Sequence, residues 1–288
     1  MKDTILFGDC RETLSAFIDK ARMCVTSPPY YGLRDYGGVQ DQIGQEQSPE
    51  EYIDNLVKVF REVRNVLTDD GTCWVNIGDS YYNYRPGRGQ ALGKQTVSNT
   101  RQDLPDVCPR RGNRLEGLKE KDLIGIPWML AFALRADGWY LRQDIIWNKP
   151  NPMPESMRDR CTKSHEYIFL LSKKQNYYFN VDAIKEPTRR KRSVWNIQKK
   201  PYRGAHFAVY PPELIEPCIL AGSKEGDCVL DPFIGSGTTA MVAKALGRDY
   251  IGCELHEDYG NLIKKRIGES QPVNKVSQPT SVNILDII

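Results

Sequence analysis

The stretch "VLDPFIGSGTTAMVAKALGRDYIGCEL" (residues 229–255) combines a buried strand, a glycine loop, a helix and a second strand within 27 residues. Gly235, Gly237 and Ala240 fit the pattern G-x-G-x-x-A, and Glu254 closes the second strand. Such glycines let the backbone approach a ligand closely, and an acid at the end of the next strand can hold ribose hydroxyls. The stretch predicts a βαβ unit that binds an adenosine-type ligand. The plainer alternative is a turn-forming glycine pair with a solvent-facing glutamate.

The residues beside these glycines narrow the choice of ligand. No Gly-Lys-Ser/Thr follows them, which excludes a phosphate-binding P-loop. A nicotinamide dinucleotide fits the glycine pattern alone. However, Asp231-Pro232 places a carboxylate at the tip of the first strand. A negative charge there repels a pyrophosphate but attracts a ligand that carries an ammonium and a sulfonium. The pattern therefore favours S-adenosylmethionine.

Outward from this stretch, apolar strand-like runs alternate with helix-like segments, which is typical of an α/β fold. The clearest helix covers 48–67, with Ser48 as N-cap, Pro49 at the first helical position and Glu51 in capping-box spacing. A "DDG" turn at 69–71 leads into a strand at 72–78. The other expected strands cover 4–8, 21–27, 139–149, 164–173, 227–233 and 249–255, and the other helices 10–18, 125–138, 211–222 and 238–247.

Composition places the chain among ordinary globular proteins, with 40% hydrophobic and 27% charged residues. The net charge of +3 is too small to identify a partner. The N-terminus has no signal-peptide layout, and no apolar run approaches the ~18 residues of a membrane span. We therefore expect a cytoplasmic protein that does not associate with a membrane. None of the eight cysteines forms a C-x2-4-C pair, so no metal is expected, and Cys24, Cys73 and Cys228 fit buried thiols.

A second motif, Ser27-Pro28-Pro29-Tyr30, ends the apolar strand at 21–27. The two prolines fix the backbone and lack N–H groups, so nearby carbonyls become acceptors with a set direction. The Ser27 hydroxyl adds a further acceptor, and Tyr30 offers a flat ring on which a base can stack. The motif therefore predicts a binding site for an exocyclic amino group on a planar ring.

These residues give the sequence a close similarity to a known family. Ser27-Pro28-Pro29-Tyr30 resembles the [Asp/Asn/Ser]-Pro-Pro-[Tyr/Phe/Trp] signature of the amino-DNA methyltransferases, which modify N6 of adenine or N4 of cytosine. Asp231-Pro232-Phe233 and the residues after it resemble their cofactor motif. The catalytic motif precedes the cofactor motif, as in the permuted β group. The resemblance implies a Rossmann-like methyltransferase fold, with a mostly parallel sheet, helices on both faces and inserted target-recognition segments.

The resemblance also implies roles for individual residues. S-adenosylmethionine would be the cofactor and S-adenosylhomocysteine the product. Asp231 would face the cationic methionine part, Glu254 the ribose hydroxyls and Asp9 the adenine amino group. The expected catalytic residues are Ser27, Pro28, Pro29 and Tyr30. The expected cofactor-binding residues are Asp9, His206, Phe207, Asp231, Pro232, Phe233, Gly235, Ser236, Gly237, Thr238, Thr239 and Glu254.

The implied reaction is direct methyl transfer to an amino nitrogen of a flipped base. Our hypothesis is that Ser27 Oγ and the Pro28 carbonyl accept hydrogen bonds from the two N–H groups of the amino nitrogen. These hydrogen bonds localise the nitrogen lone pair and position the nitrogen for transfer. Ser at the first motif position is commoner with N4-cytosine and Asp with N6-adenine, so cytosine is slightly favoured. A carbon-5 cytosine methylase would need a cysteine nucleophile, and we interpret Cys218 of Pro217-Cys218 as a core residue. Methylation of RNA and a non-catalytic nucleic-acid-binding protein remain alternatives, whereas Ser27 argues against methylation of a protein glutamine, for which Asn-Pro-Pro-Tyr is the usual motif.

Two basic segments lie between the motifs. Residues 83–121 contain nine Lys/Arg against four acidic residues, and 185–203 contain eight Lys/Arg against one Glu. Lys and Arg neutralise phosphates, and Arg, Gln and Asn read base edges, so both segments are expected to contact double-stranded DNA. The candidate DNA contacts are Tyr31, Arg34, Arg88, Arg101, Arg110, Arg111, Arg114, Arg190, Arg192, Trp195 and Lys199. For Tyr31, core packing is an equal alternative.

The expected organisation follows the two motifs and the two basic segments. It comprises the catalytic half (1–82), a basic insertion (83–121), the core continuation (122–184), a basic DNA-contacting segment (185–205), the cofactor half (206–270) and a tail (271–288). The resemblance further implies a homodimer and a cognate restriction enzyme as partners.

Overall fold

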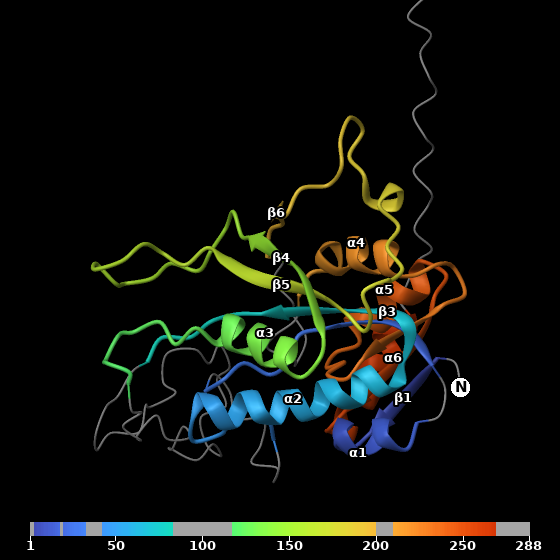
Figure 1. Cartoon of the computed structure of the whole chain (residues 1–288), viewed down its shortest axis with the longest axis horizontal. Helices are drawn as coiled ribbons and strands as arrows, with labels where there is room; N and C mark the ends of the chain where they lie inside the picture. Colours follow the sequence, from blue (N-terminus) through green and yellow to red (C-terminus); the bar gives the residue numbers. More distant parts are fainter. Residues whose placement is uncertain (1–2, 18–19, 33–41, 83–116, 200–209, 269–288) are drawn as a thin grey trace, which may run out of the picture.

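The computed structural model describes residues 3–17, 20–32, 42–82, 117–199 and 210–268. Within them, one sheet is flanked by helices (Figure 1). In chain order the elements are β1 (Thr4–Phe7), α1 (Cys10–Ser15), β2 (Ala21–Thr26), α2 (Pro49–Val66), β3 (Leu67–Ile77), α3 (Ile126–Ala136), β4 (Tyr140–Asn148), β5 (His165–Ser172), η1 (Asp182–Ile184), β6 (Val194–Asn196), α4 (Pro212–Gly222), β7 (Cys228–Asp231), α5 (Thr238–Ala245), β8 (Asp249–Glu254), η2 (Glu257–Tyr259) and α6 (Gly260–Gly268).

The sheet has the strand order β1-β8-β7-β2-β3-β5-β4-β6. Among these described strands, only β5 runs antiparallel to its neighbours, β3 and β4, and every other pairing is parallel. The carboxyl ends of the parallel strands and the start of β5 therefore meet along one side of the sheet, which we call the carboxyl edge. The expected α/β fold with a mostly parallel sheet is confirmed.

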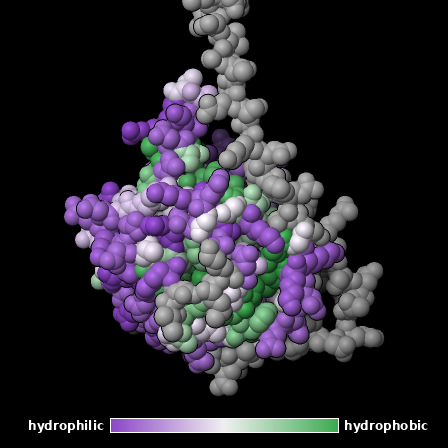
Figure 2. All heavy atoms as spheres, turned by 90° about the vertical axis from the view of Figure 1, so that its right-hand side faces the viewer, coloured by the Kyte–Doolittle hydropathy of each residue, from purple (hydrophilic) through white to green (hydrophobic). Residues whose placement is uncertain are grey.

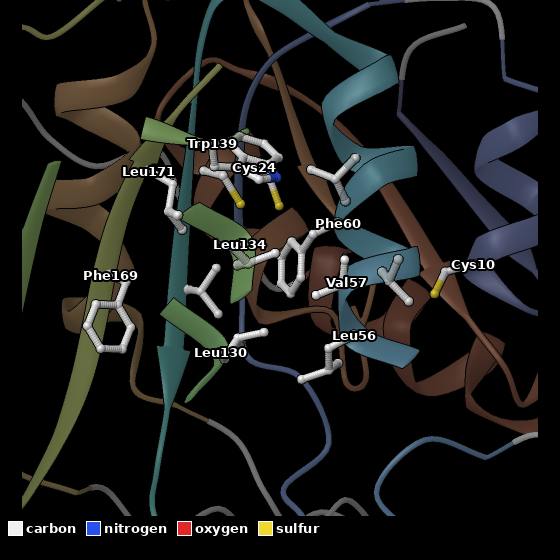
Figure 3. Close-up of a cluster of buried hydrophobic side chains, with 14 of the residues drawn as sticks. Cys10, Cys24, Leu56, Val57, Phe60, Leu130, Leu134, Trp139, Phe169 and Leu171 are labelled. Carbon is white, nitrogen blue, oxygen red and sulfur yellow. The ribbon is translucent and has the colours of Figure 1, made fainter. Parts of the chain in front are cut away.

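Helices cover both faces of the sheet. On one face, α2 packs against both α1 and α3, and the three helices cover the strands. Figure 3 shows this core, where Phe60 of α2 and Leu134 of α3 face each other between the two helices. On the other face, α4, α5 and α6 form a second core with β2, β7 and β8. The result is the α/β/α layering that nucleotide-binding folds use to bury a parallel sheet on both sides.

Three local features differ from the sequence-based expectation. β3 is a continuous strand from Leu67, without a separate turn at 69–71, because the pairing with β2 shifts register between Ala21↔Leu67 and Met23↔Thr72. β6 was not expected inside the basic segment 185–205, and it adds to the free edge of β4. The helix α6 after β8 was also not expected.

The described ends of the first basic insertion lie side by side. Tyr82 N–H donates to the Asp122 carbonyl at 2.8 Å, and Lys121 N–H donates to the Tyr82 carbonyl at 2.9 Å. Tyr81 and Leu123 form an isolated bridge next to them. We call this pairing of 81–82 with 121–123 the clasp. The chain thus leaves the core and returns to it at one place near the end of β3.

Hydrophilic side chains cover most of the face shown in Figure 2, with apolar patches between them. Most of the large apolar side chains of the described residues are gathered in the two cores. Within the same described residues, no helix is long and apolar enough to cross a membrane.

Candidate active site

The two sequence motifs meet at the centre of the carboxyl edge. β2 and β7 are neighbours, with Met23 opposite Val229 and Cys24 opposite Leu230. After β7 the chain continues to β8 on one side, and after β2 it continues to β3 on the other. Such a topological switch point opens a crevice beyond the strand ends, which is where α/β folds bind ligands. The Ser27–Tyr30 loop follows β2 and the glycine loop follows β7, so the two loops flank this switch point.

A buried hydrogen bond joins the two loops directly. Thr26 Oγ1 donates to Asp231 Oδ1 at 2.5 Å. The same carboxylate accepts from Phe233 N–H at 3.0 Å, from Tyr210 Oη at 3.1 Å and from Thr239 Oγ1. Burial raises the pKa of Asp231 above its ordinary value, although these donors oppose the shift. Asp231 is only 1% exposed, so its carboxylate lies beneath the surface of the glycine loop. This carboxylate ties β2, α5 and Tyr210 together beneath the crevice.

The glycine loop needs residues without a side chain. Gly235 and Gly237 have φ values of +52° and +84°, which favour glycine. A Cβ on Gly237 would lie 3.1 Å from Ile263 Cγ2 of α6. Ser236 is 2% exposed, and its Oγ accepts a 2.6 Å hydrogen bond from Arg266 Nη1. The side chains of the expected cofactor residues Pro232, Ser236, Thr238 and Thr239 are thus buried and shape the loop from inside.

The acid of the cofactor motif stands where the sequence predicts it. Glu254 ends β8, beside β1, and Gly8 N–H donates to its backbone carbonyl at 2.9 Å. Its side chain is in a buried setting and accepts from His256 N–H at 3.1 Å. Burial raises the pKa of Glu254 to about 7, although backbone donors at His256, Gly235 and Leu255 oppose the shift. Two further hydrogen-bond donors would stabilise the charged form of this carboxylate, and the two hydroxyls of a ribose provide them. The residues present therefore fit the adenosine part of S-adenosylmethionine.

Asp9 lies beyond the end of β1, next to the end of β8. It is the N-cap of α1 and accepts from Arg11 N–H at 2.8 Å. Its carboxylate also pairs with the Arg11 guanidinium. Partial burial works against ionisation, but Arg11 still holds the pKa of Asp9 below its ordinary value. Asp9 therefore lies at the cofactor end of the carboxyl edge. There, an adenine amino group would compete with Arg11 for the Asp9 carboxylate.

The Ser27–Tyr30 loop is anchored from two sides. Tyr52 Oη of α2 donates to the Pro29 carbonyl at 2.7 Å. Tyr30 Oη donates to Glu166 Oε2 of β5 at 2.7 Å, and the Ser27 hydroxyl opposes the rise that burial causes in the pKa of Tyr30. A Cβ on Gly78 would lie 2.8 Å from Tyr30 Cε2, so the glycine makes room for the ring. The loop is a rigid platform at the mouth of the crevice.

The candidate DNA contacts have different surroundings. Arg190, Arg192 and Lys199 are exposed, as contact with phosphates requires. Trp195 is 4% exposed, and its Nε1 donates to the Arg192 carbonyl at 2.7 Å. The expectation for Trp195 is wrong, because parallel pairing with β4 turns its ring into the core beside Trp147. Tyr31 packs on Tyr52 with ring centroids 5.4 Å apart, which favours the core-packing alternative.

The remaining candidates lie outside the described residues. They are Arg34, Arg88, Arg101, Arg110, Arg111, Arg114, His206 and Phe207.

Cysteine chemistry and metal binding find no support in the described part of the chain. Cys218 is fully buried within α4, and burial raises the pKa of its thiol above the ordinary value. The interpretation of Cys218 as a core residue is confirmed. Among the residues that the structure describes, no group of three or more His, Cys, Asp or Glu side chains is placed to hold a metal ion.

Several residues at this site escaped the sequence analysis. Tyr210 and Arg266 hold the glycine loop, and Asn76, Lys149 and Glu166 surround Tyr30. None of them sits in a recognisable spacing. The available indications were an acid in the strand at 164–173 and a lysine at the end of the strand at 139–149, both polar residues in apolar runs.

Comparisons with known proteins identify the family of the chain. The DNA methylase family model for N6 and N4 methylation matches residues 21–265. The type II methyltransferase M.SmaI of Serratia marcescens is 51% identical over 271 residues, which cover 91% of this chain and 90% of that protein. M.Cfr9I of Citrobacter freundii, also a type II methyltransferase, is 48% identical over 281 residues, which cover 95% and 91%.

Solved structures share the fold. A putative DNA modification methylase from Thermus thermophilus, solved with S-adenosyl-L-methionine, has a TM-score of 0.64 and 25% identity, and the match covers 94% of this chain and 95% of that one. PvuII DNA methyltransferase, described as cytosine-N4-specific, has a TM-score of 0.68 over 96% and 89% of the two chains. At 19% identity this second likeness shows the fold alone. From the family match, the two relatives and the site itself, we conclude that the chain belongs to the N6/N4 DNA methylase family and is an S-adenosylmethionine-dependent enzyme that methylates amino groups in DNA.

Proposed function

We propose that the chain methylates N4 of cytosine at a specific site in double-stranded DNA, with the cofactor against the glycine loop and the flipped base against the Ser27–Tyr30 loop. The observation that carries the proposal is the hydrogen bond from Thr26 to Asp231. It holds the residue before Ser27 against the first residue of the cofactor loop. A base on one loop and a cofactor on the other would then meet without a large rearrangement, and such positioning is a major source of rate enhancement.

The bound cofactor supplies a methyl group on a sulfonium, which the amino nitrogen takes up with loss of one proton to water, leaving S-adenosylhomocysteine. The protein prepares the nitrogen. Ser27 Oγ and the Pro28 carbonyl accept hydrogen bonds from its two N–H groups, and these bonds draw the nitrogen lone pair out of conjugation with the ring. The Pro29 carbonyl is committed to Tyr52, so it keeps the loop in place instead of contacting the base. The Tyr30 ring stacks on the base that has left the duplex.

The cofactor has a matching set of residues along the edge. Glu254 would hold the ribose hydroxyls, Asp9 would lie toward the adenine, and the backbone of Gly235–Gly237 would approach the methionine part. Asp231 acts from below, where its buried charge adds a negative potential toward the sulfonium. No metal is needed for this chemistry.

The choice of cytosine rests on Ser27, because serine at this motif position is commoner in enzymes that modify N4 of cytosine. N6 of adenine is the second candidate, since both amino groups present the same two N–H donors. The exposed Arg190, Arg192 and Lys199 and the basic insertion 83–121 would hold the duplex. Like its type II relatives, the chain would act beside a cognate restriction enzyme of the same specificity, and it would act as a homodimer.

The test is to methylate duplex DNA with the purified chain, digest it to nucleosides and identify the product by mass. We expect N4-methylcytosine, whereas N6-methyladenine would refute the assignment of the base. Duplex DNA should be a better substrate than single-stranded RNA of the same sequence. Ser27→Ala should abolish methylation and leave the dissociation constant for S-adenosylmethionine unchanged. Ser15→Ala, on the exposed end of α1, is the matched control. Equal loss of methylation and cofactor binding in Ser27→Ala would contradict the role of Ser27.

A further inference from the structure

Four polar side chains follow one another along the carboxyl edge, and hydrogen bonds join the first three of them: Lys149, Glu166, Tyr30 and Ser27. We propose that Glu166, held by Lys149, is a positioning residue that sets the direction of the hydrogen bonds of Tyr30 and Ser27, so that Ser27 Oγ meets the target amino group as an acceptor. This inference rests on the proposed role of Ser27. It adds a reason why the Ser27 hydroxyl, which could also donate a hydrogen bond, acts only as an acceptor toward the base.

Glu166 is placed for this role by the antiparallel strand β5. It lies at the start of β5, and its carboxylate accepts from Tyr30 Oη at 2.7 Å. Its other oxygen accepts from Nζ of Lys149, the residue that directly follows β4. Asn76 Nδ2 of β3 lies 3.4 Å from Glu166 Oε2 and donates to the Tyr167 carbonyl at 3.1 Å. The Lys149 and Glu166 side chains are 7% and 14% exposed, so their ion pair is shielded from water.

The ion pair between Lys149 and Glu166 fixes the direction in which Tyr30 and Ser27 donate their hydrogens. A carboxylate can only accept, so the Tyr30 hydroxyl must donate to Glu166. The Tyr30 oxygen is then left as an acceptor toward the Ser27 hydroxyl, which opposes the rise in the pKa of Tyr30, as a donor to that oxygen would. The hydrogen of Ser27 is thereby committed toward Tyr30, and its lone pairs remain for the base. Successive bonds that point the same way polarise one another, which strengthens the last acceptor.

Without the carboxylate, the opposite sense becomes available. Tyr30 could donate to Ser27, and the Ser27 hydrogen would then point at the N–H bonds of the base. Two donors would face each other, and an unmatched donor in a dry site is costly. Burial and the Glu166 carboxylate both raise the pKa of Tyr30, so its hydroxyl keeps the hydrogen that it donates to Glu166.

The surroundings of Lys149 show that the ion pair is built into the fold. The ammonium lies 4.4 Å from the centroid of the Trp147 ring. Burial lowers the pKa of Lys149, and Glu166 opposes that shift, while the neighbouring cations Lys199 and Lys163 add to it. Lys149 therefore depends on Glu166 as its counter-charge, just as Glu166 depends on Lys149.

The test compares single-turnover methylation rates of Glu166→Gln, Tyr30→Phe and the double variant with those of the unchanged enzyme. The amide of Glu166→Gln can turn its NH2 group to Tyr30 and reverse these hydrogen bonds, and Tyr30→Phe keeps the stacking ring but removes the link. We expect each to lower the rate about tenfold, the loss of one oriented hydrogen bond to a charged group. The double variant should be no slower than Tyr30→Phe alone, because Glu166 acts through that hydroxyl.

Dissociation constants for S-adenosylmethionine and for duplex DNA should stay within about twofold in all three variants, so that only the chemical step changes. Thermal unfolding would establish that each variant is folded, and Tyr30→Phe alone tests the inference should Glu166→Gln fail to fold. A normal rate in Tyr30→Phe, or losses that multiply in the double variant, would overturn the inference. An active Ser27→Ala would instead overturn the proposed role of Ser27. An inactive Ser27→Ala with a normal Glu166→Gln would leave that role standing and refute only the positioning by Glu166.

Discussion

Glu254→Gln should stabilise the cofactor-free protein at neutral to alkaline pH and weaken its binding of S-adenosylmethionine. Burial raises the pKa of Glu254 to about 7 from an ordinary value of 4.5. A group with a raised pKa binds its proton more tightly in the folded protein than in the unfolded chain. Its favourable contribution is therefore fully present below pH 4.5 and is lost as the pH rises through 7. Above that range, the folded protein carries the cost of a buried charge, which an uncharged glutamine removes.

The size of the effect follows from the shift in pKa. Each unit corresponds to about 1.4 kcal/mol, so a shift of about 2.5 units amounts to roughly 3 kcal/mol at pH 8. At pH 5 the unfolded chain is only partly ionised at this position, and the cost is about 1 kcal/mol. The stability of Glu254→Gln relative to the unchanged protein should thus rise by about 2 kcal/mol between pH 5 and pH 8.

The assay is urea unfolding of both proteins at pH 5 and pH 8, without cofactor, followed by calorimetric titration with S-adenosylmethionine at pH 8. Comparing the two pH values removes any constant effect of the substitution on packing. The expected pattern is a gain in unfolding free energy at pH 8 with a weaker dissociation constant for the cofactor. A stability difference that is the same at both pH values would show that Glu254 does not titrate between 4.5 and 7 in the folded protein. Unchanged cofactor binding would remove it from the ribose site.

Three further substitutions test the supports of the crevice. Thr26→Val removes one of the donors to the buried Asp231 without leaving a cavity and should lower the unfolding free energy by about 1.5–3 kcal/mol, seen as a fall of roughly 3–6 °C in melting temperature; an unchanged melting temperature would contradict the bond. Gly252→Ala drives a methyl group into Ile234 Cδ1 and should cost about 1–3 kcal/mol in urea unfolding, of which Ile234→Val in the same chain should restore a part. Arg266→Met frees the glycine loop from α6 and should weaken the dissociation constant for S-adenosylmethionine about fivefold by calorimetry, whereas a normal constant would show that the loop does not depend on α6.

Local patterns predicted the elements whose cause is local. The helix α2 begins at Pro49, and Ser48 Oγ accepts from Glu51 N–H at 3.2 Å, as the capping residues indicated. Only the return bond of the capping box differs, because the Glu51 carboxylate accepts from Gln47 N–H at 3.1 Å. The glycine loop and the Ser27–Tyr30 loop were likewise predictable, since each needs special residues at consecutive positions.

The features that the sequence analysis missed depend on pairing between distant segments. β6 has only three residues, and its alternation of Val194 at 55% exposed with Trp195 at 4% becomes visible only once β4 offers an edge. Glu166 reaches Tyr30 because β5 is inserted antiparallel between β3 and β4, which no periodicity within β5 can reveal. Arg266 acts on a loop 30 residues earlier in the chain.

The clasp bears on how such an enzyme can change what it reads. The proposed recognition insertion departs at Tyr82 and returns at Lys121–Asp122, which are hydrogen-bonded to each other independently of what lies between. Lengthening a connection between fixed ends costs little, about 0.6 kcal/mol for each doubling of its length. A new insertion can therefore be exchanged at this point while the crevice keeps its geometry. On the proposed assignment of this insertion to target recognition, the chemistry and the target sequence would be separately inheritable traits, and descendants of one methylase could diverge in specificity without passing through an inactive form.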